Sequence, residues 1–275
     1  MNPKHIERMV QIALAEDIGD GDITAALIPK EQQATAEVIT RENMILCGQA
    51  WVNEVFLQVD PKLKLNWFVK ECELVNTNSK LFSVSGSAAN LLTAERTALN
   101  FLQLFSGIAT VTNSYAKHLE NTNTKLLDTR KTLPLFRHAQ KYAVKCGGGH
   151  NHRMGLYDAY LIKENHIAAC GSIKAAIEQA RKNNPNKWLE IEVENLVEFE
   201  RAVQAKPDSI MLDNFSIENI KIAVSKKTSN IKLEVSGNIN INNIKQLAKL
   251  GVDYISVGAL TKNITAVDLS LRIVD

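Results

Sequence analysis

The sequence lacks any long hydrophobic run. None of its 275 residues lies in a stretch approaching the roughly 18 apolar residues that a membrane-spanning helix needs. The first residues, MNPKHIERMVQIALAEDIGDGD, have a helical pattern broken by acidic side chains. They lack the apolar core and the small-residue cleavage site of a signal peptide. We therefore expect a cytoplasmic protein.

An excess of charge of one sign is also missing. Lys and Arg total 32 and Asp and Glu total 30, so the formal net charge is only +2. Proteins that bind nucleic acids or membrane surfaces usually carry a one-sided basic face, so we expect neither partner. Apolar residues make up 45% of the chain, which is ordinary for a globular protein and enough for one large domain or two smaller ones.

Cysteine is scarce, and the four cysteines are scattered at positions 47, 72, 146 and 170 without a CxxC pair. We expect free thiols. No motif pairs Cys146 with a base, which favours a small buried residue over a nucleophile. His150 and His152 could join Cys146 at a metal, but no fourth ligand is obvious and the spacing is not that of a common zinc site.

Cationic side chains are dense between Asp128 and His166. Among them are Arg130, Lys131, His152, Arg153 and Lys163, around the glycine run 147–149. Arg binds carboxylate and phosphate with a planar fork of donors, and Lys acts as a compact charge. Because the whole chain is nearly neutral, this local concentration indicates a small substrate with several negative charges.

The pattern of apolar residues changes along the chain. A helix is predicted over 3–16, followed between 34 and 84 by alternating strands with one helix among them, and then by a helix from 91 to about 119. After Lys125, short apolar runs alternate with helices. The predicted strands are KLLDT, AYLIK, WLEIEVE, SIMLDN, KLEVSG and DYISVG. This repetition predicts a parallel sheet, and its regular spacing favours an α/β barrel.

Polar residues or glycines end each of these strands. They are Asp128, Lys163, Glu192 with Glu194, Asp213, Ser236 with Gly237, and Gly258. In α/β barrels the functional groups gather at the carboxyl ends of the strands. The sequence therefore predicts one shared pocket at these six strand ends.

Two acids are expected to face the cations. In LEIEVE, Ile191 and Val193 point to one side, so Glu190, Glu192 and Glu194 should point into the barrel. Glu192 and Asp213 end neighbouring strands, and inward acids opposite cations imply a bound cation or a cationic transition state. A structural salt-bridge network is the alternative. His138 and His166 are interpreted as local hydrogen-bonding residues.

Small-residue turns follow the last two predicted strands. Ser236-Gly237-Asn238 and Val257-Gly258-Ala259 would let backbone amides approach an anion, which suits a phosphate.

Long segments of the chain resemble quinolinate phosphoribosyltransferase, also called nicotinate-nucleotide pyrophosphorylase (carboxylating), of the type II phosphoribosyltransferase family. These segments are LAEDIGDGDIT, AERTALNFLQLFSGIAT, DTRKTLP, KYAVKCGGGHNHRMGLYDAYLIKENHI, EIEVEN, IMLDNFS, LEVSGNIN and GVDYISVGALT. They are long and specific, and the resemblance covers nearly the whole chain.

The resemblance implies a fold and a reaction. The fold is an N-terminal α/β sandwich over 1–110, joined by the tail 266–275, and a C-terminal, incomplete α/β barrel of the seven-stranded type over 111–265. In the reaction, quinolinate and phosphoribosyl pyrophosphate (PRPP) give nicotinate mononucleotide, pyrophosphate and carbon dioxide, with magnesium, in de novo NAD synthesis. A homodimer with active sites shared across subunits is implied, with hexamers as a further assembly.

Matching positions carry the implied roles. The residues implied to bind quinolinate carboxylates and PRPP phosphates are Thr129, Arg130, Lys131, His152, Arg153 and Lys163. Arg96 would reach the partner subunit's site. Lys163, Glu192 and Asp213 would be catalytic, and the two acids would also hold Mg²⁺ and the ribose. The two glycine turns, Ser236, Gly237, Asn238, Val257, Gly258 and Ala259, would cradle a phosphate.

One position departs from the family pattern, because Lys262 stands where the family often has histidine. Three other functions stay open. Nicotinate phosphoribosyltransferase lacks the decarboxylation step, a barrel lyase would use Lys163 as a Schiff-base nucleophile, and an anion-binding barrel would not be an enzyme. Retention of both Glu192 and Asp213 argues against pure anion binding.

Overall fold

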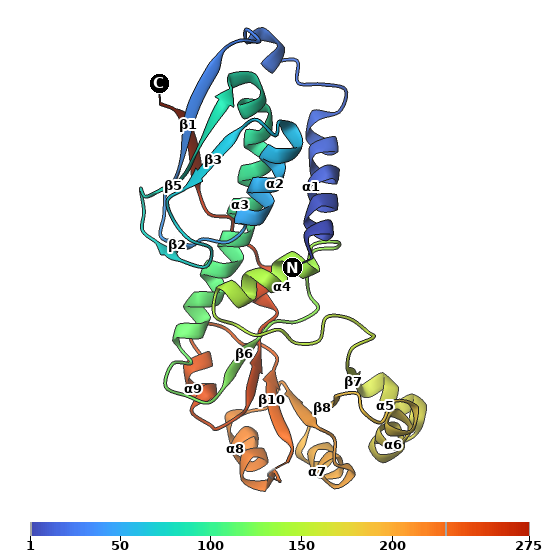
Figure 1. The fold of residues 1–275 in the computed structure, drawn as a ribbon. Coiled ribbons are helices and arrows are strands. Elements are labelled where there is room, and N and C mark those ends of the chain that lie inside the picture. Colours follow the sequence, from blue (N-terminus) through green and yellow to red (C-terminus); the bar gives the residue numbers. More distant parts are fainter. Residues whose placement is uncertain (1, 229, 275) are drawn as a thin grey trace. The chain divides into compact units, whose positions relative to one another are not determined.

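The computed structural model describes residues 2–228 and 230–274, and the chain divides into two compact units (Figure 1). The first unit comprises Met1–Asn113, His138–Gly148 and Ile264–Asp275, and the second comprises Ser114–Arg137 and Gly149–Asn263. Among the described residues, no helix has the length and apolar character needed to cross a membrane.

The first unit contains an antiparallel sheet. Its strand order is β12 (Leu269–Ile273), β1 (Gln33–Thr40), β5 (Lys80–Ser87) and β3 (Lys64–Trp67). In β1 every second side chain is buried, as expected for a sheet with one face against a core. A separate pair joins β2 (Met44–Ile45) to β4 (Leu74–Val75). The C-terminal segment of the chain thus completes a sheet that begins near the N-terminus.

Helices form the second layer of this unit. They are α1 (Pro3–Ile18), α2 (Gln49–Val59), most of α3 (Ala88–Lys117) and α4 (Arg137–Cys146), with a short 3-10 turn at Ala25–Leu27. The Asn2 side chain caps α1 by accepting a hydrogen bond from the Lys4 N–H. Phe56 of α2 packs against Phe82 of β5 with ring centroids 6.1 Å apart. Helices packed on one face of a sheet make the expected α/β sandwich.

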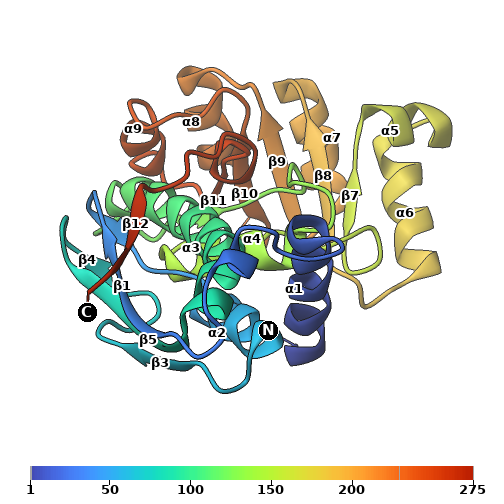
Figure 2. The ribbon, with the colours of Figure 1, turned by 90° about the horizontal axis from the view of Figure 1, so that it is seen from above.

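The second unit is built on a parallel sheet. Its strand order is β6 (Lys125–Leu127), β11 (Tyr254–Ser256), β10 (Lys232–Ser236), β9 (Ser209–Asp213), β8 (Leu189–Val193) and β7 (Tyr160–Ile162). Helices α6 (Ile173–Asn183), α7 (Leu196–Ala205), α8 (Ile217–Lys226) and α9 (Ile244–Ala248) form an arc outside the strands (Figure 2). These are the helices that the sequence predicts, and their apolar stripes bury residues such as Ile177, Phe199 and Ile220.

The prediction of an incomplete α/β barrel is confirmed, with one difference in strand number. The sheet has six strands, and a seventh position is held by a single parallel bridge between Leu127 and His150. The chain reaches His150 from a glycine turn in which Gly148 has a φ of 91°. At His152 the chain has already left the sheet. His150 is therefore the one described residue of this segment that pairs with β6.

The expectation of free thiols is wrong for Cys72 and Cys146, which form a disulfide, whereas Cys47 and Cys170 are free. The interpretation of Cys146 as a small buried thiol is therefore also wrong. The two bonded cysteines are 74 residues apart and their Cα atoms lie 4.8 Å apart. Only the folding of the first unit brings them together, so no local spacing could indicate the pairing.

Three helices were not predicted. They are α4, α5 (Glu164–Cys170) and α10 (Ala259–Lys262). Helices α5 and α10 follow strand ends directly and are short, and α4 buries Lys141 and Gln140 among its polar residues. A search for apolar spacing therefore overlooks them.

Candidate active site

Two adjoining cavities lie at the carboxyl ends of the strands in the second unit. The first, which we call the cation cavity, has a volume of about 340 Å³. It is lined by Thr129, Arg130, Lys131, His152, Arg153, Leu161, Lys163, Glu192, Met211, Asp213, Glu234, Ser236 and Ser256. The residues that the sequence predicts after β6, β7, β8 and β9 therefore meet in one place, as the barrel argument requires.

The second cavity, which we call the loop cavity, has a volume of about 650 Å³. It is lined mainly by the turns after β9, β10 and β11. Its lining residues include Asp213, Asn214, Ser236, Gly237, Asn238, Asn240, Val257, Gly258, Ala259 and Lys262. Thr129, Lys131, Asp213, Ser236 and Ser256 line both cavities, so the two form a continuous site.

The loop that carries His152 is fixed to β6 by backbone and side-chain hydrogen bonds. His150 donates its N–H to the Leu126 carbonyl at 2.8 Å, and Asp128 donates its N–H to the His150 carbonyl at 3.1 Å. The buried Asp128 carboxylate accepts the His152 N–H at 2.9 Å. The sequence predicts Asp128 only as a strand-end residue. In the structure its carboxylate and its backbone N–H hold the loop that carries His152.

Both ring nitrogens of His152 are engaged within the site. Nδ1 accepts the Arg153 N–H at 2.7 Å, so Nε2 carries the hydrogen and donates to Glu190 Oε2 at 2.8 Å. Glu234 Oε2 lies 3.6 Å from the same nitrogen. His152 is therefore held in a fixed orientation by two acids from β8 and β10.

Glu190 and Glu234 lie deep inside the barrel. Their exposed fractions are 2% and 1%, and Glu190 Oε1 accepts the Ser209 hydroxyl at 2.8 Å. Burial raises the pKa of the Glu234 carboxyl well above its usual range, and the nearby charge of Glu190 raises it further. Burial and the neighbouring acid thus both favour the neutral form of Glu234.

The inward direction predicted for the acids of β8 holds for two of three residues. Glu190 is buried and Glu192 lines the cation cavity. Glu194 follows the last residue of β8 and is exposed, and its N–H donates to the Glu198 carboxylate. The alternation ends with the strand, so the third glutamate is not directed inward.

Lys163 and Glu192 form a close ion pair, with Nζ 2.5 Å from Oε2. The side chain of Glu192 is only 10% exposed, whereas that of Lys163 is 41% exposed. The backbone of Lys163 is fixed as well, because its N–H donates to His166 Nδ1 at 3.0 Å. His166 is thus a local hydrogen-bonding residue, as expected.

Arg130 and Arg153 bring two guanidinium groups into one cavity. Burial lowers the pKa of Arg153, and the like charge of Arg130 lowers it further. The Nε of Arg130 is buried without a hydrogen-bond partner among the described residues. Like charges held close together, with a donor left unpaired, are typical of a site for an anion.

Asn214 connects Asp213 to the turn after β10. Its side chain donates to the Asp213 carboxylate at 2.8 Å and accepts from Asn238 at 3.1 Å. Gly237, with a φ of 92°, passes so close that a Cβ at this position would collide with the Asn214 side chain. The sequence does not single out Asn214, although its place directly after a strand-end acid was a usable signal.

The turn after β11 holds Lys131 in place. The Thr261 hydroxyl donates to the Lys131 carbonyl at 2.8 Å, and the Lys131 N–H donates to the Thr129 hydroxyl at 3.1 Å. A Cβ on Gly258 would lie 3.0 Å from the Lys131 side chain. The glycine thus leaves room for this lysine at the edge of the loop cavity.

Of the residues that the family resemblance implies in the site, Arg96 is the one that lines neither cavity. It lies on α3 in the first unit, and its side chain is 61% exposed. Its nearest acid is the neighbouring Glu95, at 4.0 Å. A role for Arg96 in a partner subunit's site is consistent with this exposure and stays a prediction.

Glu192 and Asp213 are chemically suited to magnesium. They end the neighbouring strands β8 and β9, and carboxylate oxygens are hard ligands of the kind that Mg²⁺ prefers. Glu192 already pairs with Lys163, so the protein offers this ion few oxygens. Such a sparse set fits Mg²⁺, which usually keeps waters and binds substrate phosphates in addition to one or two carboxylates.

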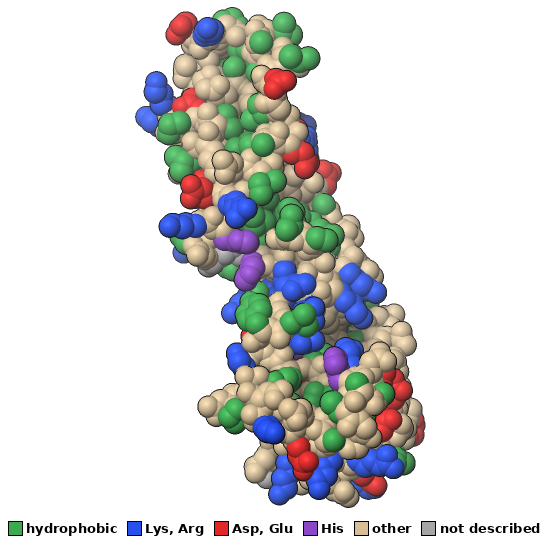
Figure 3. All heavy atoms as spheres, turned by 90° about the vertical axis from the view of Figure 1, so that its right-hand side faces the viewer, with side chains coloured by type: hydrophobic (Ala, Val, Ile, Leu, Met, Phe, Trp, Pro, Cys, Tyr) green, Lys and Arg blue, Asp and Glu red, His purple; other side chains and the backbone are tan. Residues whose placement is uncertain are grey.

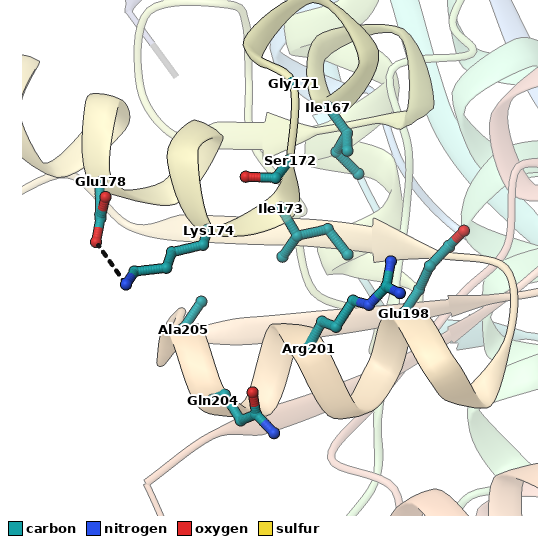
Figure 4. A pocket seen from close by; sticks show the side chains of 10 residues that line it. All are labelled: Ile167, Gly171, Ser172, Ile173, Lys174, Glu178, Glu198, Arg201, Gln204 and Ala205. Atoms are coloured by element: carbon teal, nitrogen blue, oxygen red, sulfur yellow. Dashed lines mark ion pairs between the residues drawn. The ribbon is translucent and has the colours of Figure 1, made fainter.

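A third cavity lies outside the sheet, among α5, α6 and α7 (Figure 4). It contains none of the predicted site residues, and its ion pair joins Lys174 to Glu178 at 3.8 Å within one helix. Both side chains are largely exposed, so they are solvated and do not converge on a ligand.

Figure 3 shows several Lys and Arg side chains gathered near a hollow on one face of the molecule.

The fold and the two cavities define an α/β-barrel protein with a cation-lined site at the carboxyl ends of its strands. Comparison with known families identifies which one. Residues 22–106 match the N-terminal domain of quinolinate phosphoribosyl transferase, and residues 108–272 match its C-terminal domain. The chain belongs to the quinolinate phosphoribosyltransferase family.

Individual relatives agree with this assignment. A Bacillus subtilis protein described as a probable nicotinate-nucleotide pyrophosphorylase (carboxylating) is 37% identical, over 99% of this chain and 95% of its own length. The solved structure of the nicotinate-nucleotide pyrophosphorylase from Francisella tularensis is 53% identical, with a TM-score of 0.97 and coverage of 99% and 97%. The Ehrlichia chaffeensis structure of the same description is 41% identical, with a TM-score of 0.93 and coverage of 97% of both chains.

Proposed function

We propose that this enzyme transfers the phosphoribosyl group of PRPP to quinolinate with decarboxylation. The products are nicotinate mononucleotide, pyrophosphate and carbon dioxide, and the reaction belongs to NAD biosynthesis. The observation that carries this proposal is the meeting of four permanent cations and two carboxylates in one cavity: Arg130, Lys131, Arg153, Lys163, Glu192 and Asp213. Membership of the family supplies the substrate class.

The cations account for substrate binding. Quinolinate carries two carboxylates, and a guanidinium binds a carboxylate through two parallel hydrogen bonds. Arg130 and Arg153, which repel each other in the free site, would each gain an anionic partner. Leu161 and Met211 line the same cavity and would contact the apolar faces of the pyridine ring. His152 holds the Arg153 backbone in position.

PRPP fits the adjoining loop cavity. Its phosphate would contact backbone and side-chain donors of Ser236, Gly237, Asn238 and the Val257–Gly258–Ala259 turn, with Lys131 and Lys262 nearby as charges. Lys131 and Thr129 line both cavities and would meet both substrates. The substrates would thus be held side by side, which lowers the entropic barrier to their reaction.

Glu192 and Asp213 would act on the ribose. Cleavage of the bond to pyrophosphate develops positive charge at the anomeric carbon, and fixed carboxylates stabilise such charge. The Lys163 ammonium keeps Glu192 oriented, and Asn214 does the same for Asp213. Mg²⁺ held by these two acids would supply charge neutralisation for the departing pyrophosphate.

Decarboxylation needs little from the protein. Once the ring nitrogen carries ribose, loss of carbon dioxide leaves an electron pair on the adjacent ring carbon. The positive nitrogen stabilises this pair, and a proton from water then binds the carbon, so no general base is assigned. The Lys163–Glu192 ion pair suits a permanent cation, whereas a Schiff-base lyase needs a neutral amine at this position. Borohydride trapping with a carbonyl substrate would detect that alternative.

The test is a turnover assay with quinolinate, PRPP and magnesium that follows nicotinate mononucleotide. We expect product to form with quinolinate and not with nicotinate. Turnover of nicotinate at a comparable rate would instead identify a nicotinate phosphoribosyltransferase. Chelation of magnesium should abolish turnover, and full activity after chelation would contradict the metal proposal.

We further propose a homodimer whose active sites are completed across subunits, with assembly into hexamers as an extension. The exposed Arg96, which lines neither cavity, supports the shared site. The cytoplasmic location expected from the N-terminal sequence remains a prediction.

A further inference from the structure

Three cysteines and one glutamate meet near the beginning of α2 in the first unit. The Cys47 Sγ, a carboxylate oxygen of Glu71 and the Cys146 Sγ all lie within 4.8 Å of one another. Cys72 joins this cluster through its disulfide with Cys146. Three potential metal ligands from three distant parts of the sequence therefore lie close together, and Cys72 is bonded to one of them.

The Glu71 carboxylate is held in place by backbone donors. It accepts the Gly48 N–H at 3.0 Å and the Gln49 N–H at 3.1 Å, at the amino end of α2. Burial raises the pKa of the Cys47 thiol, and the charge of Glu71 raises it further. Burial and the same carboxylate also raise the pKa of Tyr142. Glu71 is thus an oriented carboxylate beside a buried thiol and a tyrosine hydroxyl.

The disulfide alone does not account for this arrangement. Thiol–disulfide exchange depends on the access of the attacking thiol to the disulfide. Cys47 is fully buried, whereas Cys72 is exposed. A surface crosslink does not need Cys47, which lies within 4.8 Å of the Cys146 sulfur, or the Glu71 carboxylate, which also accepts hydrogen bonds from the amino end of α2.

A zinc ion would use all four groups. Structural zinc sites are tetrahedral, and a Zn–S bond of about 2.3 Å places neighbouring ligand atoms about 3.8 Å apart. Cys47, Glu71 and Cys146 lie close enough together for three positions of such a set, and opening the disulfide would free Cys72 to become the fourth ligand. Thiolates select zinc over magnesium or calcium, and a bound metal deprotonates a thiol whose own pKa is high. The hydrogen bonds to Glu71 would orient that ligand.

We propose that the reduced protein binds Zn²⁺ through Cys47, Glu71, Cys72 and Cys146, and that the Cys72–Cys146 disulfide is the oxidised, metal-free form of the same site. A dithiol reductant supplies two electrons and two protons, which convert the disulfide to two thiols while the reductant becomes a disulfide. Zinc then replaces one proton on each of three thiols. Cys72 is exposed, so a reductant can approach the disulfide from this residue.

The experiment is a Co²⁺ titration of the fully reduced, metal-free protein. We expect one Co²⁺ per chain with a thiolate-to-cobalt charge-transfer band in the near ultraviolet, and loss of that band when Zn²⁺ is added. A carboxylate site, such as the one proposed at Glu192 and Asp213, produces no such band, so the two sites are distinguished. The disulfide form should show no band.

Variants test each class of ligand. Cys72→Ala, at the exposed position, and Cys47→Ala, at the buried one, should each lose the band or bind Zn²⁺ at least tenfold more weakly. Cys170→Ala removes an exposed cysteine of the second unit and is the matched control, with binding unchanged. If Cys47→Ala fails to fold, Cys72→Ala and Glu71→Gln still decide the question.

Two results would overturn the proposal. One is the absence of the charge-transfer band in the reduced wild-type protein at stoichiometric Co²⁺. The other is a Cys72→Ala protein, or a disulfide-bonded wild-type protein, that binds Zn²⁺ as tightly as the reduced wild-type protein does.

Discussion

Arg130 and Arg153 show how single residues prepare this site for its substrate. Their guanidinium groups lie close enough for one to lower the pKa of the other, and the buried Nε of Arg130 has no hydrogen-bond partner within residues 2–228 and 230–274. Such an arrangement is unfavourable in the free protein, and an anion would relieve it. Lys163 and Glu192 behave differently, because each already neutralises the other before any substrate binds.

Arg130→Ala and Lys163→Ala should each reduce kcat/KM by at least about tenfold to a hundredfold. The reason is that charge-assisted hydrogen bonds contribute about 1.5–3 kcal/mol, and about 1.4 kcal/mol corresponds to a factor of ten. The measurement is steady-state kinetics with quinolinate and PRPP, together with circular dichroism to confirm the fold. Lys182→Ala, at an exposed position of α6, is the control for loss of one positive charge. Wild-type activity in either site variant would refute the assignment.

Glu234→Gln should become more stable relative to wild type as the pH rises. In the unfolded chain this glutamate ionises at about pH 4.3, whereas in the folded protein its raised pKa keeps it protonated. The wild-type protein therefore loses stability above about pH 4.3, until the pH passes the raised pKa, and glutamine removes this loss. Urea denaturation of both proteins at about pH 5 and about pH 8 measures the difference.

The control for Glu234→Gln is Glu178→Gln, whose side chain is 66% exposed. Its stability difference from wild type should stay nearly constant over the same pH range. A constant difference for Glu234→Gln as well would mean that Glu234 is ionised in the folded protein.

At the scale of elements, the sequence predicts the strands of the barrel and where they end. The strands with continuous apolar runs, such as β9, and their following helices were predicted because burial on both faces leaves a clear pattern. Lys163, Glu192 and Asp213 were therefore placed at one edge correctly. Helix α4 could not be predicted from apolar spacing, since it buries Lys141 and Gln140.

The arrangement of strands and turns also explains why two parts of the site were not predicted from the sequence. Glu234 has the same alternating position in LEVS as Glu190 has in LEIEV, so the signal was present but was applied only to β8. The link from Asn238 through Asn214 to Asp213 depends on the turns after two different strands. Only the three-dimensional pairing of β9 with β10 brings these turns together.

Gly237→Ala should raise the KM for PRPP and lower stability by more than Gly171→Ala does. Both glycines have positive φ, of 92° and 86°, so alanine is strained at each by about 1–2 kcal/mol. Only at Gly237 would the new Cβ also collide with Asn214, whereas nothing lies within 4 Å at Gly171. Thermal denaturation and PRPP titrations of the two variants provide the comparison. Equal KM values for PRPP in Gly237→Ala and wild type would contradict a phosphate site at this turn.

At the scale of the whole molecule, the cavities belong to the second unit alone, whereas Arg96 belongs to the first. The family assignment spans both units, because its two domain matches together cover residues 22–106 and 108–272. A shared active site in a dimer would give the first unit a direct part in the reaction.

Mixing Arg96→Ala with Lys163→Ala should restore activity to about one quarter of wild type. Random exchange makes about half of the dimers mixed, and each mixed dimer keeps one site with neither substitution. Activity is measured before and after subunit exchange, which is verified by differently tagged chains. No recovery after verified exchange would mean that Arg96 acts within its own subunit or not at all.

The central claim is that the cation cavity binds a doubly acidic pyridine. A crystal structure of the protein with quinolinate bound tests it most directly. The predicted result places both carboxylates within hydrogen-bond distance of cations that line this cavity, Arg130 and Arg153 among them. Quinolinate bound elsewhere, for example in the cavity among α5, α6 and α7, with Arg130 and Arg153 untouched, would contradict it.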